Sequence, residues 1–182
     1  MSSAIYTVLG TFAASVQIIP GLPMFYAPEG FIVPATLWFG FWGALGAFFG
    51  SILFSPFYGY GYTVGTLFAI VDMIVPLVAG YCLRKLKIDI SLRDKRSLAY
   101  FVAFGCVVNV LLEALIGVYV SYSVGFYTLI FAYTYGLLAW FVGSFTGTLV
   151  IGGFLLRALS SYFIRSPLYH ESLLPRKPET GS

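Results

Sequence analysis

The sequence predicts an all-helical bundle that crosses a membrane about six times. Of its 182 residues, 59% are hydrophobic and only 9% are charged. A soluble domain has about a quarter of its residues charged, and a disordered chain is poor in apolar residues, so both classes are excluded. A spanning helix needs roughly 20 residues, which leaves room for six or seven. We expect one transmembrane domain over residues 1–165 and a disordered polar tail over residues 166–182.

The basic residues are concentrated in two places, which predicts the orientation of the chain. Glu29 and Asp72 are the ionised side chains of the first 83 residues, whereas a basic loop follows at 84–97 and the basic part of the tail begins at Arg157. A basic patch can serve nucleic acid or anionic lipid, but short loops rich in Lys and Arg also remain in the cytoplasm. We favour the second interpretation, in which the basic residues fix the orientation of the chain in the cell membrane. It places both termini on the inner side and needs no nucleic acid as partner.

The first half of the chain is expected to contribute four helices. An uncharged run at 4–19 predicts the first, and a loop rich in breakers follows at 20–30. Residues 31–54 permit one span, but a proline and four glycines favour two short helices joined near Trp38–Trp42. With a span at 63–83, this division gives an even number of crossings before the basic loop. Three undivided helices would instead place the N-terminus outside.

The second half is expected to contribute two crossings. Residues 98–120 predict one span, whereas the apolar run at 126–164 is too long for one ordinary span. Its glycines suggest a break near 142–147. Because two full helices would place the basic tail outside, we expect a short, partly inserted segment followed by one helix at 143–163.

Polar side chains within the predicted spans are candidates for a binding site. Ionisable groups at membrane depth are costly and usually face the bundle interior, a partner or water. Asn109 and Glu113 are four residues apart and share a helix face, and Asp72 lies mid-span in its own helix. If these helices pack together, the three side chains line a cavity suited to a cation or to a cationic or hydroxyl-rich small molecule. The alternative is that they act as interhelical hydrogen bonds.

Residues of the predicted outer loops could close such a site. Glu29 lies in the first outer loop, and Tyr58 and Tyr60 lie in an aromatic, glycine-rich loop at 55–62. Tyrosines at a membrane interface usually form an aromatic belt, and a lid over a ligand pocket is the alternative. Trp38 is open to two interpretations in the same way, as an interface anchor or as a ring that stacks on a ligand.

A small-residue face on the first helix is a candidate docking surface. Gly10 and Ala14 lie one turn apart with Ala13 beside them, and such faces let another helix approach closely in lipid. The other helix could belong to a partner membrane protein or to this chain.

The sequence has no catalytic or metal-ligating pattern. The single His170 excludes a Ser/His/Asp set, and Cys82 and Cys106 lack a metal-binding or redox spacing. The glycine-rich stretches lack the Lys and Ser/Thr of a phosphate loop. We therefore expect a protein that is not an enzyme and needs no cofactor, with Arg157 snorkelling to the lipid headgroups.

Several segments resemble the substrate-binding S components of energy-coupling-factor transporters, which are small proteins of six helices. They are the Gly10-x-x-x-Ala14 face, WFGFWGALGAFFGSILF at 38–54, GYCLRKL at 80–86 and GTLVIGGFLLRAL at 147–159. The resemblance implies that the first helix docks on a coupling subunit and that outer loops and later helices enclose a vitamin-like ligand. That family normally has alanine at both ends of the first-helix motif, and Gly10 departs from this pattern.

A second resemblance is to the membrane-associated sensor domains that precede bacterial kinases and cyclic-nucleotide enzymes. It depends on segments 33–54, 71–85 and 134–156, where WFVGSFTGTLVIGGFLL is similar to that family's late Trp-Gly-x-x-x-Gly helix, with Ser144 in place of its acid. Those domains are usually longer and precede a cytoplasmic output domain. We therefore rank a small-molecule uptake subunit first. A sensor or scaffold module, or an accessory subunit of a larger membrane complex, comes second.

Overall fold

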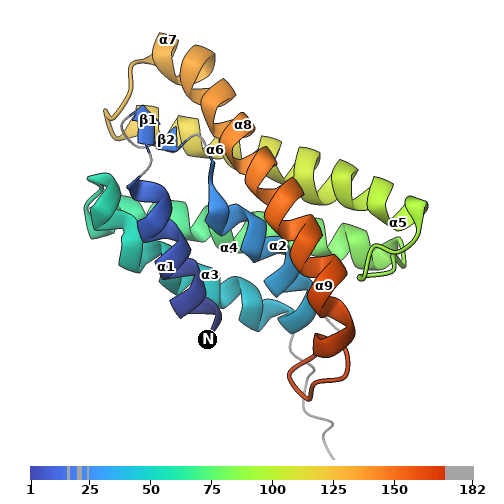
Figure 1. Cartoon of the computed structure of the whole chain (residues 1–182). Coiled ribbons are helices and arrows are strands. Elements are labelled where there is room, and N and C mark those ends of the chain that lie inside the picture. Colours follow the sequence, from blue (N-terminus) through green and yellow to red (C-terminus); the bar gives the residue numbers. More distant parts are fainter. Residues whose placement is uncertain (16, 20–21, 24, 171–182) are drawn as a thin grey trace, which may run out of the picture.

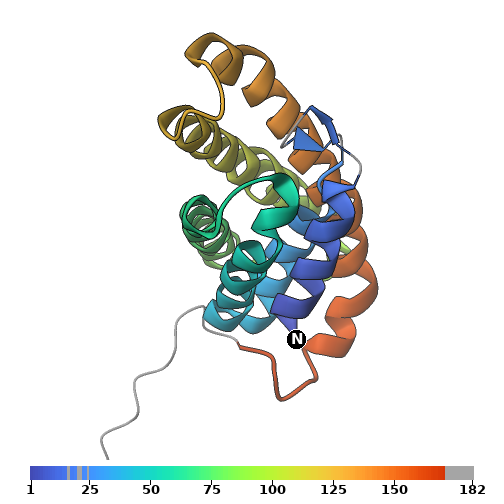
Figure 2. The ribbon, with the colours of Figure 1, turned by 90° about the vertical axis from the view of Figure 1, so that its left-hand side faces the viewer.

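The computed structural model describes residues 1–15, 17–19, 22–23 and 25–170. These residues form an elongated bundle of six helical segments, each running opposite to the one before it (Figures 1 and 2). The all-helical membrane bundle predicted from the sequence is confirmed. A short antiparallel pairing of β1 (Gln17–Ile19) with β2 (Leu22–Pro23) is added between the first two helices.

The first helix lies along the third. α1 (Ser2–Ala14) is parallel to α3 (Phe41–Phe54), and glycines of α3 let the backbone of α1 approach, since an added Cβ on Gly50 would lie 2.9 Å from Tyr6 Cβ. At about 1.5 Å per residue, the 13 residues of α1 extend for about 20 Å, less than the hydrocarbon core of about 30 Å.

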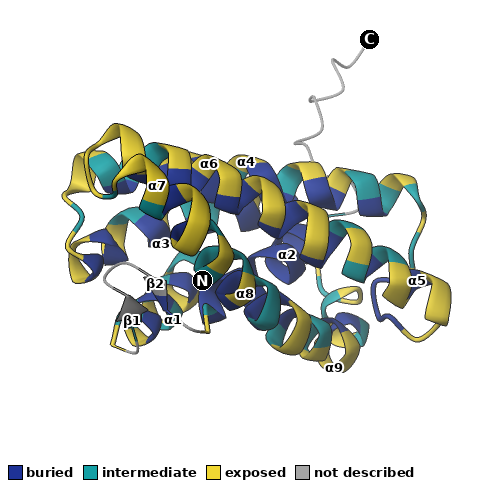
Figure 3. Cartoon of the chain, turned by 90° about the horizontal axis from the view of Figure 1, so that it is seen from above, coloured by how far each residue is buried: buried dark blue, intermediate teal, exposed yellow. Residues whose placement is uncertain are grey.

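The predicted division of residues 31–54 into two helices is confirmed. α2 (Ala27–Phe39) ends at Gly40, whose φ of 57° is a conformation that favours glycine, and α3 begins at the next residue. α2 is buried along its whole length, and Figure 3 shows it in dark blue among helices whose outer faces are yellow. The polar and apolar side chains of α2 therefore contact protein rather than lipid.

The next two segments are long enough to cross a bilayer. α3 continues as a 3₁₀ turn, η1 (Ser55–Tyr58), and α4 follows over Tyr62–Lys85. After the basic loop, three elements form one continuous helix over Lys95–Ser123: α5 (Lys95–Tyr100), a π-helical stretch η2 (Phe101–Val108) and α6 (Asn109–Ser123).

The last segment corrects one prediction. Residues Leu129–Phe163 form one continuous helix of 35 residues rather than a partly inserted segment followed by a second helix. Its elements are α7 (Leu129–Phe131), η3 (Ala132–Gly136), α8 (Leu137–Gly147), η4 (Thr148–Gly152) and α9 (Gly153–Phe163), of which η3 and η4 are π-helical. The glycines near 142–147 do not break the helix, because Gly147 gives room to α2. A Cβ added there would overlap the carbonyl oxygen of Tyr26.

Within the described residues, four segments are long and apolar enough to cross a membrane: Phe41–Tyr58, Tyr62–Lys85, Lys95–Ser123 and Leu129–Phe163. The first helix is apolar but short. The protein is therefore a multi-pass membrane protein, in which two short helices, α1 and α2, pack among four longer ones.

The inner end of the bundle joins three distant parts of the chain. The backbone N–H of His170 donates to the Trp38 carbonyl at 2.9 Å. The Arg84 guanidinium donates to the carbonyls of Leu37 and His170, the latter at 2.6 Å. These bonds join Ser166–His170, the first residues of the expected disordered tail, to the bundle, and residues 171–182 lie outside the described part.

Candidate functional site

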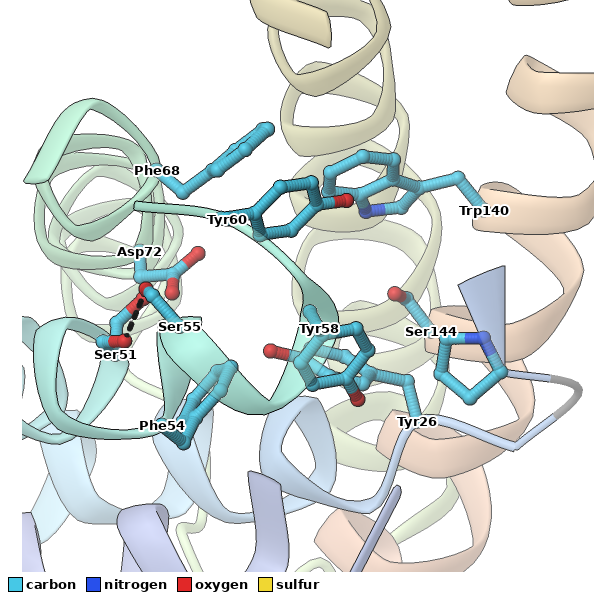
Figure 4. Close-up of a pocket in the computed structure, with 11 residues that line it drawn as sticks. Tyr26, Ser51, Phe54, Ser55, Tyr58, Tyr60, Phe68, Asp72, Trp140 and Ser144 are labelled. Atoms are coloured by element: carbon cyan, nitrogen blue, oxygen red, sulfur yellow. Dashed lines mark hydrogen bonds between the residues drawn. The ribbon is translucent and has the colours of Figure 1, made fainter. Parts of the chain in front are cut away.

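An aromatic cavity lies at the end of the bundle opposite to the basic loop (Figure 4). Rings from four different segments surround it, and hydroxyl groups and one carboxyl group give it a polar side. Its lining consists of Pro23, Tyr26, Ser51, Phe54, Ser55, Tyr58, Tyr60, Phe68, Asp72, Trp140 and Ser144. The cavity has a volume of about 40 Å³, which is enough for about three water molecules.

Asp72 is the one acid in the lining of this cavity. It lies near the middle of α4 and is 5% exposed, and its Oδ2 accepts a hydrogen bond from the Tyr6 hydroxyl at 3.1 Å. Tyr6 belongs to α1 and is completely buried. The carboxyl group of Asp72 therefore joins the first helix to the fourth while it faces the cavity.

The aromatic walls come from the turn after α3 and from α4 and α8. The rings of Tyr58 and Tyr60 are stacked with their centroids 6.1 Å apart, and the ring centroids of Tyr60 and Phe68 are 4.9 Å apart. Phe68 in turn contacts Trp140 at 5.7 Å. The hydroxyls of Tyr58 and Tyr60 are buried and have no hydrogen-bond partner among the described residues, so the lining offers polar groups that a ligand or water can satisfy.

A second polar group lies deeper, and we call Glu29, Asn109 and Glu113 the acid–amide cluster. Asn109 Nδ2 donates to Glu29 Oε1 at 2.7 Å, which joins α2 to α6. Neither oxygen of Glu113, which is 1% exposed, has a hydrogen-bond partner within the described part of the chain. Glu113 interacts electrostatically with Glu29 and with Asp72. The acid–amide cluster is therefore a neighbour of Asp72, although the cluster itself does not line the cavity.

Two sequence predictions about acids are changed by this geometry. Glu29 lies in helix α2, completely buried, and not in an outward-facing loop. Pro28 is compatible with this position, since proline is accommodated in the first turn of a helix. One cavity was expected to be lined by Asp72, Asn109 and Glu113, but of these three the cavity contains Asp72 alone. Asn109 instead donates a hydrogen bond to Glu29, and Glu113 interacts electrostatically with Glu29.

The aromatic candidates separate into two groups. Tyr58 and Tyr60 line the cavity, as a pocket role requires. Trp38 lies far from it, since its Nε1 donates to Ser160 Oγ at 3.0 Å and its ring stacks on Phe163 at 4.5 Å. Trp38 is 1% exposed, so its ring does not face lipid, and it does not line the cavity. It holds α2 against α9.

The small-residue face of α1 is used within the chain. Gly10 is buried against Phe54 of α3, and Ala13 is 1% exposed. Ala14 is half-buried. The face that was expected to dock on a partner is therefore occupied by internal packing, which was the alternative interpretation.

Most of the cavity lining was not among the predicted site residues: Pro23, Tyr26, Ser51, Phe54, Ser55, Phe68, Trp140 and Ser144. Tyr6, which binds Asp72, and Arg84, which binds carbonyls at the inner end, were not predicted either. Tyr6 precedes Gly10 by one turn on the same face of the first helix, so its burial could have been inferred. No local signal marks Ser51 or Arg84, because a serine in a span and an arginine in a basic loop are both ordinary, and Ser144 was noted only as the residue in place of the acid of the sensor-domain motif. Among the described residues, no group of three His, Cys, Asp or Glu side chains is arranged to hold a metal ion.

Comparison with known proteins separates the two resemblances. The MASE1 family model matches residues 2–176, nearly the whole chain. No curated protein and no solved structure matches. The resemblance to S components, which was ranked first, therefore has no support, and the resemblance to sensor domains, which was ranked second, is confirmed. The chain belongs to MASE1, a family of membrane-associated sensor domains.

Proposed function

We propose that this domain is the input part of a membrane sensor and that its signal is a small cationic group bound in the aromatic cavity. The observation that carries the proposal is the position of Asp72, a single buried carboxyl group that faces a cavity walled by aromatic rings. A carboxylate attracts a cation directly, and aromatic faces attract it through their quadrupoles. An alkylammonium ion combines the charge and the small apolar surface that this lining matches.

The size of the cavity narrows the ligand class. Room for about three waters suits an ammonium group with a short alkyl chain and excludes a whole vitamin-like molecule, which needs a pocket of about 300 Å³ or more. The basic loop belongs on the cytoplasmic side, so the cavity at the other end faces outward. A ligand therefore reaches it from outside the cell.

The helix contacts supply a route from the cavity to the inner end. Asp72 binds Tyr6 of α1 and interacts with Glu113, which interacts with Glu29 on α2. The other end of α2 carries the Leu37 and Trp38 carbonyls that Arg84 and His170 bind. A displacement of α2 would thus reach the segment Ser166–His170. In this proposal the domain binds its signal and transmits it, without transporting or transforming it.

Binding of methylammonium tests the proposed site. The best small ligands gain about −1.5 kcal/mol per non-hydrogen atom, so methylammonium is expected to bind with a free energy of about −3 kcal/mol, which corresponds to a millimolar Kd. Asp72→Asn should weaken binding at least tenfold, because a charge-assisted interaction is worth about 1.5–3 kcal/mol. The measurement is an NMR titration of the detergent-solubilised protein with methylammonium and with methanol, its neutral counterpart.

Asp94→Asn is the matched control for this titration. Asp94 is an exposed acid at the opposite end, where it caps α5 by accepting from the Ser97 N–H at 2.8 Å. Hydrogen bonding to the side chain and to the backbone of Ser97 lowers the pKa of Asp94. Asparagine caps a helix equally well, so this variant should bind methylammonium like the unaltered protein. Equal binding of methanol, or an unchanged affinity in Asp72→Asn, would contradict the proposal.

Arg84→Gln is expected to uncouple the inner end of the bundle. Hydrogen bonds from a charged donor contribute about 1.5–3 kcal/mol, so their loss should accelerate amide hydrogen exchange at 165–170 by about tenfold or more. Lys85→Gln, next in sequence and exposed, is the control and should leave exchange unchanged. Equal exchange in the two variants would show that Arg84 does not hold the segment Ser166–His170.

A further inference from the structure

A second hollow, which we call the inner groove, lies at the opposite end of the bundle from the aromatic cavity. It has a volume of about 400 Å³ and lies between the basic loop, the start of the fifth helical segment and α9. Apolar atoms form most of its lining, which consists of Leu92, Leu98, Leu149, Gly153, Phe154, Arg157 and Ala158. Nothing in the proposed sensing mechanism uses it.

Two guanidinium groups flank one side of the inner groove. Arg157 lines it directly and has no hydrogen bond or ion pair within residues 1–15, 17–19, 22–23 and 25–170. Arg93 Nη2 donates to Ser161 Oγ at 3.0 Å. Because Arg157 and Ser161 are four residues apart on one helix, they share a face, and the Arg93 guanidinium therefore lies about one turn from Arg157.

The acids of the basic loop do not neutralise this pair. Asp89 accepts hydrogen bonds from the backbone N–H groups of Ser91 at 2.9 Å and Arg93 at 3.3 Å. Asp94 accepts from the Ser97 N–H. Both carboxyl groups accept hydrogen bonds from the backbone of the loop, and within the described residues neither forms an ion pair with Arg93 or Arg157, so the two guanidinium groups remain available to an anion.

The position of the groove identifies the anion. Arg157 is exposed near the inner end of a membrane-spanning helix, from which an arginine side chain can reach the lipid headgroups. Leucine and phenylalanine side chains extend from that level toward the membrane interior. We propose that the inner groove binds an anionic phospholipid, with its phosphate between Arg157 and Arg93 and the upper part of an acyl chain along Leu98, Leu149 and Phe154.

Lipid retention measured by native mass spectrometry tests this site. The protein is reconstituted in nanodiscs with equal parts of phosphatidylglycerol and phosphatidylcholine and then released in the gas phase. One phosphatidylglycerol per chain should be retained in preference to phosphatidylcholine. Arg157→Gln should lower that retention about fivefold, the effect of one basic residue at a membrane surface. Arg165→Gln, an exposed arginine that does not line the groove, should not change it.

A second variant acts on the groove without changing charge. Among the described residues, a Cβ added to Gly153 would contact only Phe101 Cε1, at 3.8 Å, so the backbone at Gly153 accepts a side chain, and Gly153→Leu places one beside the groove. It should lower retention as Arg157→Gln does, while the melting temperature is kept. Equal retention of the two lipids, an equal loss in Arg165→Gln, or full retention in both Arg157→Gln and Gly153→Leu would overturn the proposal. Methylammonium binding at Asp72 is independent of each of these outcomes.

Discussion

Replacement of Gly147 by leucine is expected to prevent the assembly of the bundle. Gly147 and Gly30 form the crossing point of the last helix with α2, and a Cβ on either glycine would overlap a backbone carbonyl oxygen of the other helix. A backbone atom cannot rotate away as a side chain does, so the two helices must separate. Overpacking costs about 1–3 kcal/mol when side chains can adjust, and a larger loss is expected here because α2 is buried along its whole length.

The measurement is thermal unfolding in detergent together with the elution profile of the purified protein. Gly61→Leu is the matched control, because a Cβ added to Gly61 meets no heavy atom of the described residues within 4 Å. The Gly147→Leu protein should aggregate or melt far below the unaltered protein, and the Gly61→Leu protein should melt near it. A Gly147→Leu protein that melts normally would show that the two helices do not cross at this point.

Replacement of Asn109 by leucine is expected to produce the second large effect, through Glu29. The Asn109 amide is the hydrogen-bond donor to Glu29 Oε1, and the other oxygen of Glu29 has no partner within the described residues. The substitution leaves a completely buried carboxyl group without a donor, which costs about 1–3 kcal/mol and more if the group is charged. The free energy of unfolding, measured by denaturant titration in mixed micelles, should fall by that amount.

A double-mutant cycle separates this cost from simple loss of volume. Removal of both partners of a buried polar pair is less harmful than removal of one, so Glu29→Leu with Asn109→Leu should recover part of the stability lost in the single Asn109→Leu variant. Glu29→Gln keeps an acceptor for Asn109 and should have a small effect. Additive losses in the double variant would show that the two side chains do not interact.

The sequence was sufficient for the features that depend on composition. The scarcity of charge predicts a membrane bundle, and a run of glycines around Gly40 predicts the division between α2 and α3. The cost of placing ionisable groups in lipid identified Asp72 and Glu113 as interior residues, and both are buried in the structure.

The sequence was insufficient wherever the same residue type has two physical roles. The glycines near 142–147 can end a helix or admit a neighbour, and only the position of α2 shows that Gly147 admits one. Proline can lie in a loop or begin a helix, which is why Glu29 was placed in a loop. The pairing of Glu29 with Asn109 spans 80 residues and follows from the packing of α2 against α6, for which a single sequence has no signal.

The carbonyls at the end of α2 have a practical consequence for protein engineering. Two of them, on Leu37 and Trp38, are satisfied by Arg84 and by the backbone of His170. A reporter enzyme spliced on directly after Phe163 would delete one of these donors and expose hydrogen-bonding groups that the intact chain covers. Chimaeras should therefore be joined downstream of His170, where the graft leaves this closure in place.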